Sequence, residues 1–368
     1  MEEKLRVLIV DDTVTYRKIV SSVLAEMPGV EVVGTAANGK IAMDKVVQTQ
    51  PDLLLLDLEM PEMDGLEVLR RLKAAGSPVG AIVLSVLTAQ GAQSTLTCLE
   101  LGVFDFILKP INGTFDENLE RIRQALRRRL AAYARRHDVR AILAGASRLP
   151  QAAVGLAARP VPPPATSAAA SCKPEIVAIG VSTGGPKALS EMLPRLPDDL
   201  PVPVVIVQHM PPVFTKSLAD DLNSRCRLRV CEAGDGQALL PGWIYIAPGG
   251  KQMNVQRSDG RVVLKITDDP PENSCRPSVD YLFRSVVATY GGNSLAVIMT
   301  GMGSDGTAGC RLVKARGGRV IAQDEGSCVV FGMPRQPIEE GLAGVVAPLD
   351  GLAAEIVRAV QRGGRQCK

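Results

Sequence analysis

Short runs of Val, Ile and Leu recur along this chain, each bounded by Gly, Pro or Asp and followed by a stretch with helical periodicity. Near-continuous apolar runs of this kind are typical of parallel β-strands whose two faces are both covered by helices. The runs are LRVLIV, EVVGTA, PDLLLLD, GAIVLSV and FDFILKP, then EIVAIGV, PVVIVQH, RLRVCEA, WIYIAP, NSLAVIMT and GRVIAQD. The alternation predicts two doubly wound α/β domains with parallel sheets. Residues 253–266, centred on Asp259-Gly260, predict a β-hairpin inserted in the second domain.

The net charge of the chain is only +3, but the charges are distributed unevenly over three segments. Residues 1–120 contain 10 basic side chains (Lys and Arg) and 18 acidic ones (Asp and Glu). Residues 121–173 contain 11 basic and 1 acidic, and residues 174–368 contain 21 basic and 20 acidic. Residues 141–173 contain 11 Ala and 5 Pro, a composition that offers little to pack. We therefore expect a first domain over residues 1–124, a basic and then Ala/Pro-rich linker over 125–173, and a second domain over 174–368.

Several classes of protein are disfavoured by composition. No apolar run approaches the roughly 18 residues of a membrane span, and no secretory signal opens the chain. The basic segment has no recognition motif beside it, so nucleic acid is not an expected partner. Eight Cys without a C-x-x-C pair and only two His argue against a disulfide framework or a Cys/His zinc site. We expect a cytoplasmic protein with reduced thiols and no direct membrane insertion.

Acidic side chains end two of the predicted strands of the first domain. Asp11 and Asp12 follow the first strand and Asp57 ends the third. Because the carboxyl ends of parallel strands meet at one edge of a sheet, we expect the three carboxylates to converge there. Mg²⁺ would relieve their repulsion and attract a phosphate, toward which Asp57 could act as a nucleophile. Helix N-capping is the alternative role for any one of these residues.

The motifs VLIVDD, LLLLDLEMPEMDGLEVL, LSVLT and DFILKP resemble those of the response-regulator receiver domain over residues 4–124. The resemblance implies a flavodoxin-like fold in which a histidine kinase phosphorylates Asp57. It also implies Mg²⁺ held by Asp11, Asp12, Asp57 and the backbone carbonyl of Glu59. The switch residues of the family would be Ser85, Phe106 and Lys109.

A candidate nucleophile lies in the second domain. The run AIGVSTGGPKAL places Ser182 between a predicted strand and a predicted helix, where it is either an exposed nucleophile or a helix cap. His209, the only His of this half, follows the next strand, and Asp305 follows the strand NSLAVIMT. All three positions fall on the same edge of the predicted sheet. They form a plausible Ser-His-Asp triad, a constellation defined by geometry and not by chain order.

Two alternatives stay open on the residues alone. GMGSDG, residues 301–306, has the G-x-G-x-x-G spacing of a dinucleotide-binding turn, with Asp324 ending the next strand. Against this stands Asp305, whose carboxylate would repel a pyrophosphate. The other alternative is a binding module that is controlled by the first domain and performs no chemistry.

The second half also resembles a known family, on AIGVSTGGPKAL, VVIVQHMPPVFTKSLADDLN, GWIYIAPGGKQM, SCRPSVDYLFRSVV and VIMTGMGSDGTAGC. These motifs are similar to the catalytic domain of the chemotaxis protein-glutamate methylesterases, the CheB family. The resemblance implies a Rossmann-like domain in which Ser182 is the nucleophile, His209 the base and Asp305 its orienting acid. Thr183 and Met302 would line the site, with the Met302 N–H as an oxyanion donor. Demethylation of glutamate γ-methyl esters and deamidation of glutamines on methyl-accepting chemoreceptors would follow, without a cofactor for the esterase reaction.

Overall fold

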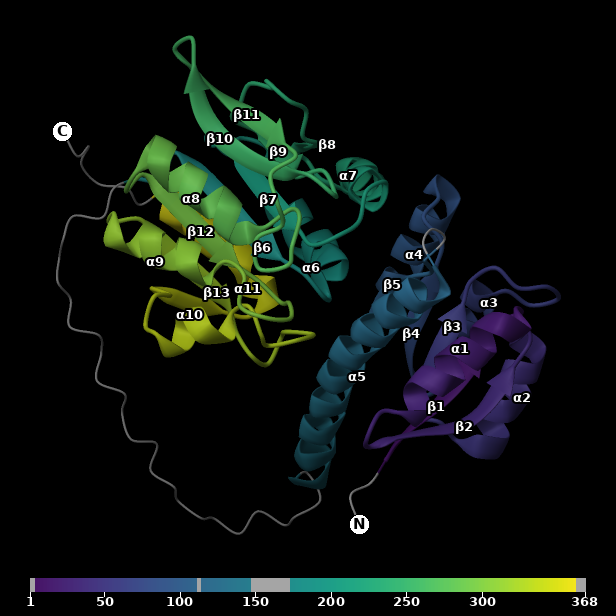
Figure 1. The fold of residues 1–368 in the computed structure, drawn as a ribbon. Coiled ribbons are helices and arrows are strands. Elements are labelled where there is room, and N and C mark those ends of the chain that lie inside the picture. Colours follow the sequence, from purple (N-terminus) through teal and green to yellow (C-terminus); the bar gives the residue numbers. More distant parts are fainter. Residues whose placement is uncertain (1–3, 111–113, 147–172, 362–368) are drawn as a thin grey trace.

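The computed structural model describes residues 4–110, 114–146 and 173–361, and within them the side chains of residues 136–146 are not described. Two α/β units lie side by side in Figure 1, the N-terminal unit (residues 4–146) and the C-terminal unit (residues 173–361). The part of the expected linker in residues 147–172 lies outside the described residues. No helix in the described ranges has both the length and the apolar character needed to cross a membrane.

The N-terminal unit contains a sheet of five parallel strands in the order β2-β1-β3-β4-β5. Its strands are β1 (Leu5–Val10), β2 (Val30–Ala36), β3 (Leu53–Asp57), β4 (Gly80–Ser85) and β5 (Asp105–Leu108). Its helices are α1 (Val14–Ala25), α2 (Gly39–Thr49), α3 (Gly65–Ala74), α4 (Ala89–Leu101) and α5 (Phe115–Ala146). Helices α1 and α5 cover one face and α2, α3 and α4 the other, which buries β3 on both faces.

The C-terminal unit contains seven parallel strands in the order β14-β13-β12-β6-β7-β9-β8. The strands are β6 (Ile176–Val181), β7 (Val204–Gln208), β8 (Arg229–Glu232), β9 (Trp243–Ile246), β12 (Ser294–Ile298), β13 (Arg319–Gln323) and β14 (Val345–Ala347). The helices are α6 (Gly185–Met192), the short η1 (Leu193–Arg195), α7 (Phe214–Arg225), α8 (Val279–Tyr290), α9 (Thr307–Ala315), α10 (Arg335–Glu339) and α11 (Leu349–Gln361). Both predicted parallel sheets are thus confirmed, and β14 is a strand that the apolar runs did not predict.

The predicted hairpin is also confirmed. Strands β10 (Gln252–Ser258) and β11 (Arg261–Thr267) pair antiparallel as a separate sheet that packs on α8. Ser258 pairs with Arg261, so Asp259 and Gly260 form the two-residue turn between them. Both have positive φ, 48° and 74°, as the tight hairpin turn that suits twisted strands requires.

Helix α5 extends beyond residue 124, where we had expected the first domain to end. It continues to Ala146, and Leu126, Leu130 and Tyr133 are buried against the N-terminal unit. The Tyr133 hydroxyl donates a hydrogen bond of 2.8 Å to the carbonyl of Asp52. The basic composition of this segment concealed the apolar stripe that packs on the sheet.

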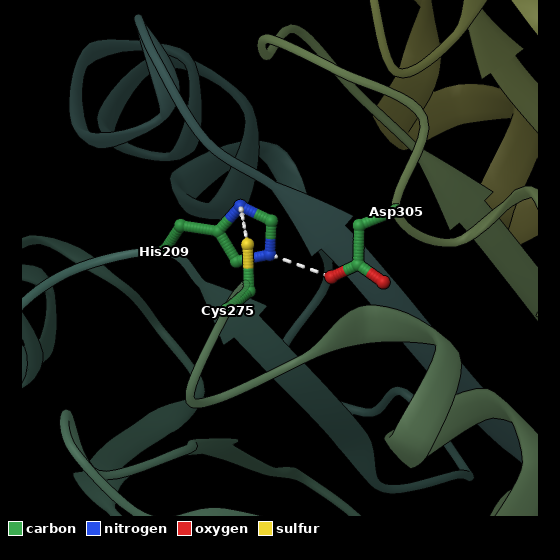
Figure 2. A group of neighbouring side chains, drawn as sticks. All are labelled: His209, Cys275 and Asp305. Carbon is green, nitrogen blue, oxygen red and sulfur yellow. Dashed lines mark hydrogen bonds and ion pairs between the residues drawn. The ribbon is translucent and has the colours of Figure 1, made fainter. Parts of the chain in front are cut away.

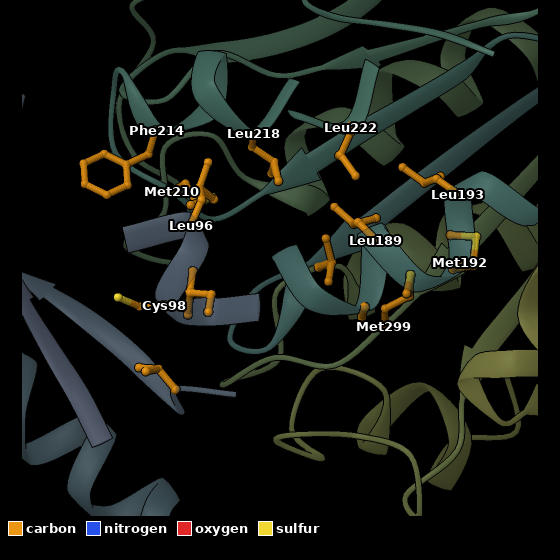
Figure 3. Packing of buried hydrophobic residues seen from close by; sticks show 14 of the residues in the cluster. Leu96, Cys98, Leu189, Met192, Leu193, Met210, Phe214, Leu218, Leu222 and Met299 are labelled. Carbon is orange, nitrogen blue, oxygen red and sulfur yellow. The ribbon is translucent and has the colours of Figure 1, made fainter. Parts of the chain in front are cut away.

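The two units share an apolar contact surface. Helix α4 packs against α6 and α7, and Leu96 and Leu99 join the same buried cluster as Leu189 and Phe214. Figure 3 shows Leu96 near Met210 and Phe214 in this cluster. An ion pair of 2.5 Å between Glu100 and Arg225 lies at its edge. The α4 side of the N-terminal unit therefore faces the C-terminal unit.

Candidate active site

Ser182 lies in the turn between β6 and α6, where backbone contacts fix its position. Its N–H donates to the carbonyl of Thr300 at 3.0 Å, and its carbonyl accepts from the N–H of Gly185 at 2.8 Å. Gly184 has a φ of +79°, which favours glycine, and a Cβ there would lie 2.5 Å from the Val329 side chain. Gly301 packs against Ser182 itself, since a Cβ on Gly301 would lie only 2.7 Å from the Ser182 Cβ.

His209 and Asp305 form a hydrogen-bonded pair beside this turn. The N–H of His209 donates to the carbonyl of Val181 at 3.1 Å, which aligns the end of β7 with the end of β6. His209 Nε2 lies 2.8 Å from Asp305 Oδ2 (Figure 2). Ser182 and His209 line the same cavity of about 570 Å³. The structure therefore brings all three predicted triad residues to one edge of the sheet.

Asp305 is anchored at the amino end of α8. It accepts hydrogen bonds from Ser278 Oγ at 2.9 Å and from the N–H groups of Val279 and Asp280 at 2.7 and 3.1 Å. Asn273 adds a fourth bond of 2.8 Å. Burial alone would raise the pKa of Asp305, but the bonds from His209, Val279 and Asn273 prevail and lower it to about 2. Asp305 is thus a fixed negative charge that orients the imidazole.

The charge of the His209 ring depends on its hydrogen-bond partner Asp305. Burial would lower the pKa of His209, but the hydrogen bonds to Asp305 and Cys275 prevail and raise it to about 9. In the described structure no hydrogen bond joins Ser182 Oγ to the ring, and Cys275 Sγ lies over the face of the ring, 3.8 Å from Nδ1 (Figure 2). The His–Asp half of a triad is assembled here, whereas Ser182 and His209 share the cavity without a direct bond.

Residues of both units line the cavity. Its wall on one side comes from β5 and α5, and on the other from the loops after β6, β7 and β12. Thr183 Oγ1 donates to Asp105 Oδ2 of β5 at 3.0 Å, and Arg129 of α5 forms an ion pair with the same carboxylate at 3.0 Å. Met302 also lines the cavity, and its N–H has no hydrogen-bond acceptor within the described ranges. Thr183 and Met302 thus both line the cavity that also contains Ser182 and His209.

A second cluster lies at the carboxyl edge of the N-terminal sheet. Asp11, Asp12 and Asp57 offer oxygen atoms that all lie within 4.8 Å of one another. Lys109 Nζ lies 2.7 Å from Asp11 Oδ2 and 2.6 Å from Asp57 Oδ2. Burial raises the pKa of Asp57 and outweighs the opposite effect of Lys109. A set of carboxylate oxygens fits a hard divalent cation such as Mg²⁺.

The remaining predicted residues of this unit have separate surroundings. The Ser85 hydroxyl accepts a hydrogen bond of 2.8 Å from Thr95 of α4. The Phe106 ring stacks on Phe214 of the C-terminal unit, with ring centroids 4.9 Å apart and planes 4° apart. Glu59 donates its backbone N–H to the Asp57 carboxylate. Of the residues predicted for this unit, Asp11, Asp12, Asp57 and Lys109 therefore form one cluster of side chains.

The geometry of the GMGSDG turn argues against the dinucleotide alternative. Its first glycine, Gly301, packs directly on Ser182. The carboxylate of Asp305 turns toward His209 and the amino end of α8. The turn is therefore built around the serine site, and its acidic side chain would still oppose a pyrophosphate.

Three residues that the sequence reasoning missed contribute to this site: Cys275, Asn273 and Asp105. Each acts through a partner more than thirty residues away in the chain. The helix start at Ser278, directly before the apolar run of α8, was the one local signal that could have located the anchor of Asp305.

Comparison with known proteins relates each unit to a family. The pattern of the CheB methylesterase family matches residues 177–356, and that of the response regulator receiver domain matches residues 7–123. A protein-glutamate methylesterase/protein-glutamine glutaminase of Desulfotalea psychrophila is 50% identical over 98% of this chain and 99% of its own length. One from Nocardioides sp. is 45% identical over 97% and 96%. The crystal structure of the Thermotoga maritima CheB methylesterase catalytic domain is 45% identical with a TM-score of 0.50, covering 50% of this chain and 98% of its own.

Proposed function

Because this chain belongs to the CheB methylesterase family, with a receiver domain before the catalytic domain as its motifs predicted, we propose that it is a phosphorylation-activated esterase. Its proposed substrates are glutamate γ-methyl esters on methyl-accepting chemoreceptors, with glutamine deamidation as a second activity. The observation that carries the proposal is the placement of Ser182 and the His209–Asp305 pair around one cavity. The names of the relatives indicate the substrate class.

The proposed reaction uses a serine nucleophile and water. Ser182 Oγ attacks the ester carbonyl while its proton passes to His209 Nδ1, the ring nitrogen that Asp305 does not hold. The Met302 N–H donates to the developing oxyanion, and Thr183 lines the site. Methanol leaves with the proton from His209, and water then releases the acyl group as a free glutamate. A glutamine side chain would lose ammonia through the same acyl-enzyme.

We infer that the structure corresponds to the restrained state of the enzyme. The hydroxyl of Thr183, next to the nucleophile, is bonded to Asp105 of the N-terminal unit. The same unit forms one wall of the cavity, where a receptor segment would have to enter. Release of the N-terminal unit would free Thr183 and open the cavity, and small movements of the loops would then bring Ser182 and His209 into contact.

Control by phosphorylation would act through β5. We propose that a histidine kinase transfers a phosphoryl group to Asp57. Asp11, Asp12, Asp57 and the Glu59 carbonyl would hold Mg²⁺, which when bound supplies positive charge for the phosphoryl oxygens. A phosphoryl group on Asp57 would draw Lys109 away from its present partners. Because Lys109 directly follows β5, which carries Asp105 and Phe106, this displacement would loosen both contacts with the C-terminal unit.

The proposed function also divides the chain into two domains and a connector. Residues 1–124 would form the receiver domain, 125–173 the connector and 174–368 the catalytic domain, with α5 carrying the receiver into the connector. The protein would act in the cytoplasm, with no nucleic-acid partner and no membrane insertion of its own.

The assignment of the nucleophile is tested by Ser182→Ala. We expect methanol release from methylated receptor membranes to fall by a factor of roughly 10⁴ or more. Ser224→Ala is the matched control, because Ser224 lies on α7 with its hydroxyl bonded to the Asp221 carbonyl. Substantial methanol release by the Ser182 variant would refute the assignment. A binding module without chemistry would also leave Ser182 unlabelled by a serine-directed covalent probe.

The regulatory part has its own test. A small-molecule phosphodonor should raise the esterase rate of the wild-type chain and leave the rate of Asp57→Asn unchanged. Methanol release from receptor membranes measures both rates. If the two proteins show equal rates with and without the phosphodonor, control through Asp57 is refuted while the esterase assignment stands.

A further inference from the structure

Two buried carboxylates lie next to each other at the amino end of α8. Asp280, in the first turn of the helix, is 5% exposed, and Asp305, which is anchored there, is 3% exposed. Like charges at short range in a buried place destabilise each other. Burial, assisted by the charge of Asp305, raises the pKa of Asp280 and outweighs the hydrogen bond from the Gly309 N–H. The pair therefore needs a neutral donor between the two groups.

One side-chain amide supplies that donor to both carboxylates. Asn273 Nδ2 donates to Asp280 Oδ2 at 2.9 Å and to Asp305 Oδ1 at 2.8 Å. An amide nitrogen carries two hydrogens, so each carboxylate accepts one of them. The reverse orientation would place the amide oxygen against two acceptors. The two carboxylates therefore fix the orientation of the amide, and the amide offsets their repulsion without adding a charge.

The other ionisable groups around the pair leave this task to Asn273. Within residues 173–361, His209 is the one cationic side chain in ion-pair contact with either carboxylate. Four further groups act on Asp280 from the turn before α8, from α8 and from α9: Glu272, Arg284, Cys310 and Arg311. Both arginines have acidic partners of their own, Glu272 and Glu340, at 2.7 and 2.5 Å. Burial raises the pKa of Cys310 to about 12, which keeps this thiol neutral.

A tight turn holds Asn273 in place. The N–H of Cys275 donates to the Glu272 carbonyl at 2.8 Å, and the N–H of Glu272 donates back at 3.1 Å. Between them Asn273 and Ser274 have φ values of +53° and +60°, a conformation that asparagine adopts more readily than most residues. Cys275 of the same turn lies over the His209 ring. The turn of residues 272–275 therefore contacts both members of the His209–Asp305 pair.

We propose that Asn273 is a positioning residue of the esterase, which keeps Asp305 directed at His209 by sharing its amide between the two buried carboxylates. Asp305 presents Oδ2 to the ring in Figure 2, and Oδ1 is the oxygen that Asn273 holds. Without the amide, Asp280 would repel Asp305, and the Asp305 carboxylate would turn away from the ring. This role rests on the proposed function, because it acts through the base of the esterase reaction.

Asn273→Gly tests this role, because glycine adopts the positive φ without strain and lacks the amide. We expect kcat for methanol release to fall by about 10- to 100-fold, the effect of losing a hydrogen bond to a charged group, with KM unchanged. Ser274→Gly is the matched control, since it changes an exposed neighbour that also has a positive φ. Equal kcat in the two variants, or a change confined to KM, overturns the proposal. Thermal unfolding checks that both variants are folded.

Asn273→Asp tests the effect of charge. Below its pKa the new carboxyl group donates one hydrogen bond, and above it a third negative charge faces the pair. Because the two carboxylates raise the pKa of the new group, the His209–Asp305 contact should persist at about pH 5 and be lost by about pH 8. Ser274→Asp is the control, because it adds the same charge on an exposed side chain one residue away. Its His209–Asp305 contact should persist over the whole pH range.

Proton NMR of the full-length chain measures this contact directly, since a proton shared by a buried imidazole and a carboxylate resonates far downfield. Assignment is simple, because His137 is the only other histidine of the sequence. A downfield signal in Asn273→Asp that does not change with pH overturns the proposal. If Asn273→Asp does not fold, the kcat and the downfield signal of Asn273→Gly decide. A wild-type chain without esterase activity refutes the proposed function, and the NMR signals still decide whether Asn273 positions Asp305.

Discussion

At the scale of single residues, the charge of His209 decides what the site can do. Asp305 orients the ring, yet the same contact, together with Cys275, raises the pKa of His209 to about 9 despite its burial. A general base must be neutral to accept a proton. In the restrained arrangement only a small fraction of the molecules therefore carries a competent base at neutral pH.

This charge state predicts the pH dependence of the unphosphorylated enzyme. We expect kcat/KM for ester hydrolysis to rise with pH, to reach half of its maximum near pH 9 and to level off above that pH, because the imidazole is half neutral at its pKa. Asp305→Asn removes the larger of the two contacts that raise the pKa of His209, so the inflection of this variant should move to lower pH. Its plateau should fall by roughly 10⁴, because the ring loses its orientation. An inflection at the same pH in both proteins would contradict this role of Asp305.

Among the elements, the turn after β12 shows how glycine shapes the serine site. Gly301 leaves no room for a side chain, since a Cβ would lie 2.4 Å from Met333 Sδ and 2.7 Å from the Ser182 Cβ. Met333 is fully buried, which limits its ability to move aside. An added methyl group would thus displace Ser182, the proposed nucleophile.

Gly301→Ala should accordingly lower kcat for methanol release by about 100-fold, the cost of a displacement of roughly 1 Å at a reacting group. Gly326→Ala is the matched control, because a Cβ there meets nothing within 4 Å and its φ is not positive. Circular dichroism and thermal unfolding establish that both variants fold. Full activity in the Gly301 variant would mean that the turn does not position Ser182.

The helices and strands also show which parts of the fold could be predicted from the sequence and which could not. The long apolar runs predicted both sheets because continuous burial on two faces leaves an unmistakable pattern. Strand β14 was missed because it has three residues, of which Val345 and Val346 are exposed. The convergence of Ser182, His209 and Asp305 followed from strand ends alone. The place of Cys275 could not be predicted, because it depends on the turn of residues 272–275, which brings this residue beside His209, 66 residues away in the chain.

At the scale of the whole molecule, the four residues of β5 connect the two sites. Asp105 bonds to Thr183, Phe106 stacks on Phe214, and Lys109, directly after the strand, contacts Asp57. No sequence pattern could place these contacts, because they lie between two units that fold around separate sheets.

Asp105→Ala should therefore raise the basal esterase rate. Loss of a hydrogen bond worth about 1.4 kcal/mol would shift the balance between restrained and released states by up to about tenfold. The fold-activation by a phosphodonor should shrink by the same factor, because the substitution and phosphorylation both shift the equilibrium between the restrained and released states. Glu100→Ala is the control: its ion pair with Arg225 is partly exposed and should contribute little. Equal basal rates in Asp105→Ala and the wild type would contradict the link.

The hydrogen bond between Thr183 and Asp105 also bears on the kinetics of the enzyme. It places the N-terminal unit on the residue beside Ser182, the proposed nucleophile, in the space that a receptor segment would have to enter. The N-terminal unit is then a tethered competitive inhibitor, present at one fixed effective concentration whatever the amount of enzyme. Phosphorylation would chiefly lower the apparent KM, and dense arrays of receptors would partly overcome the restraint without any signal. Receptor crowding would thus set the lower limit of methylesterase activity, and the kinase would set the response above it.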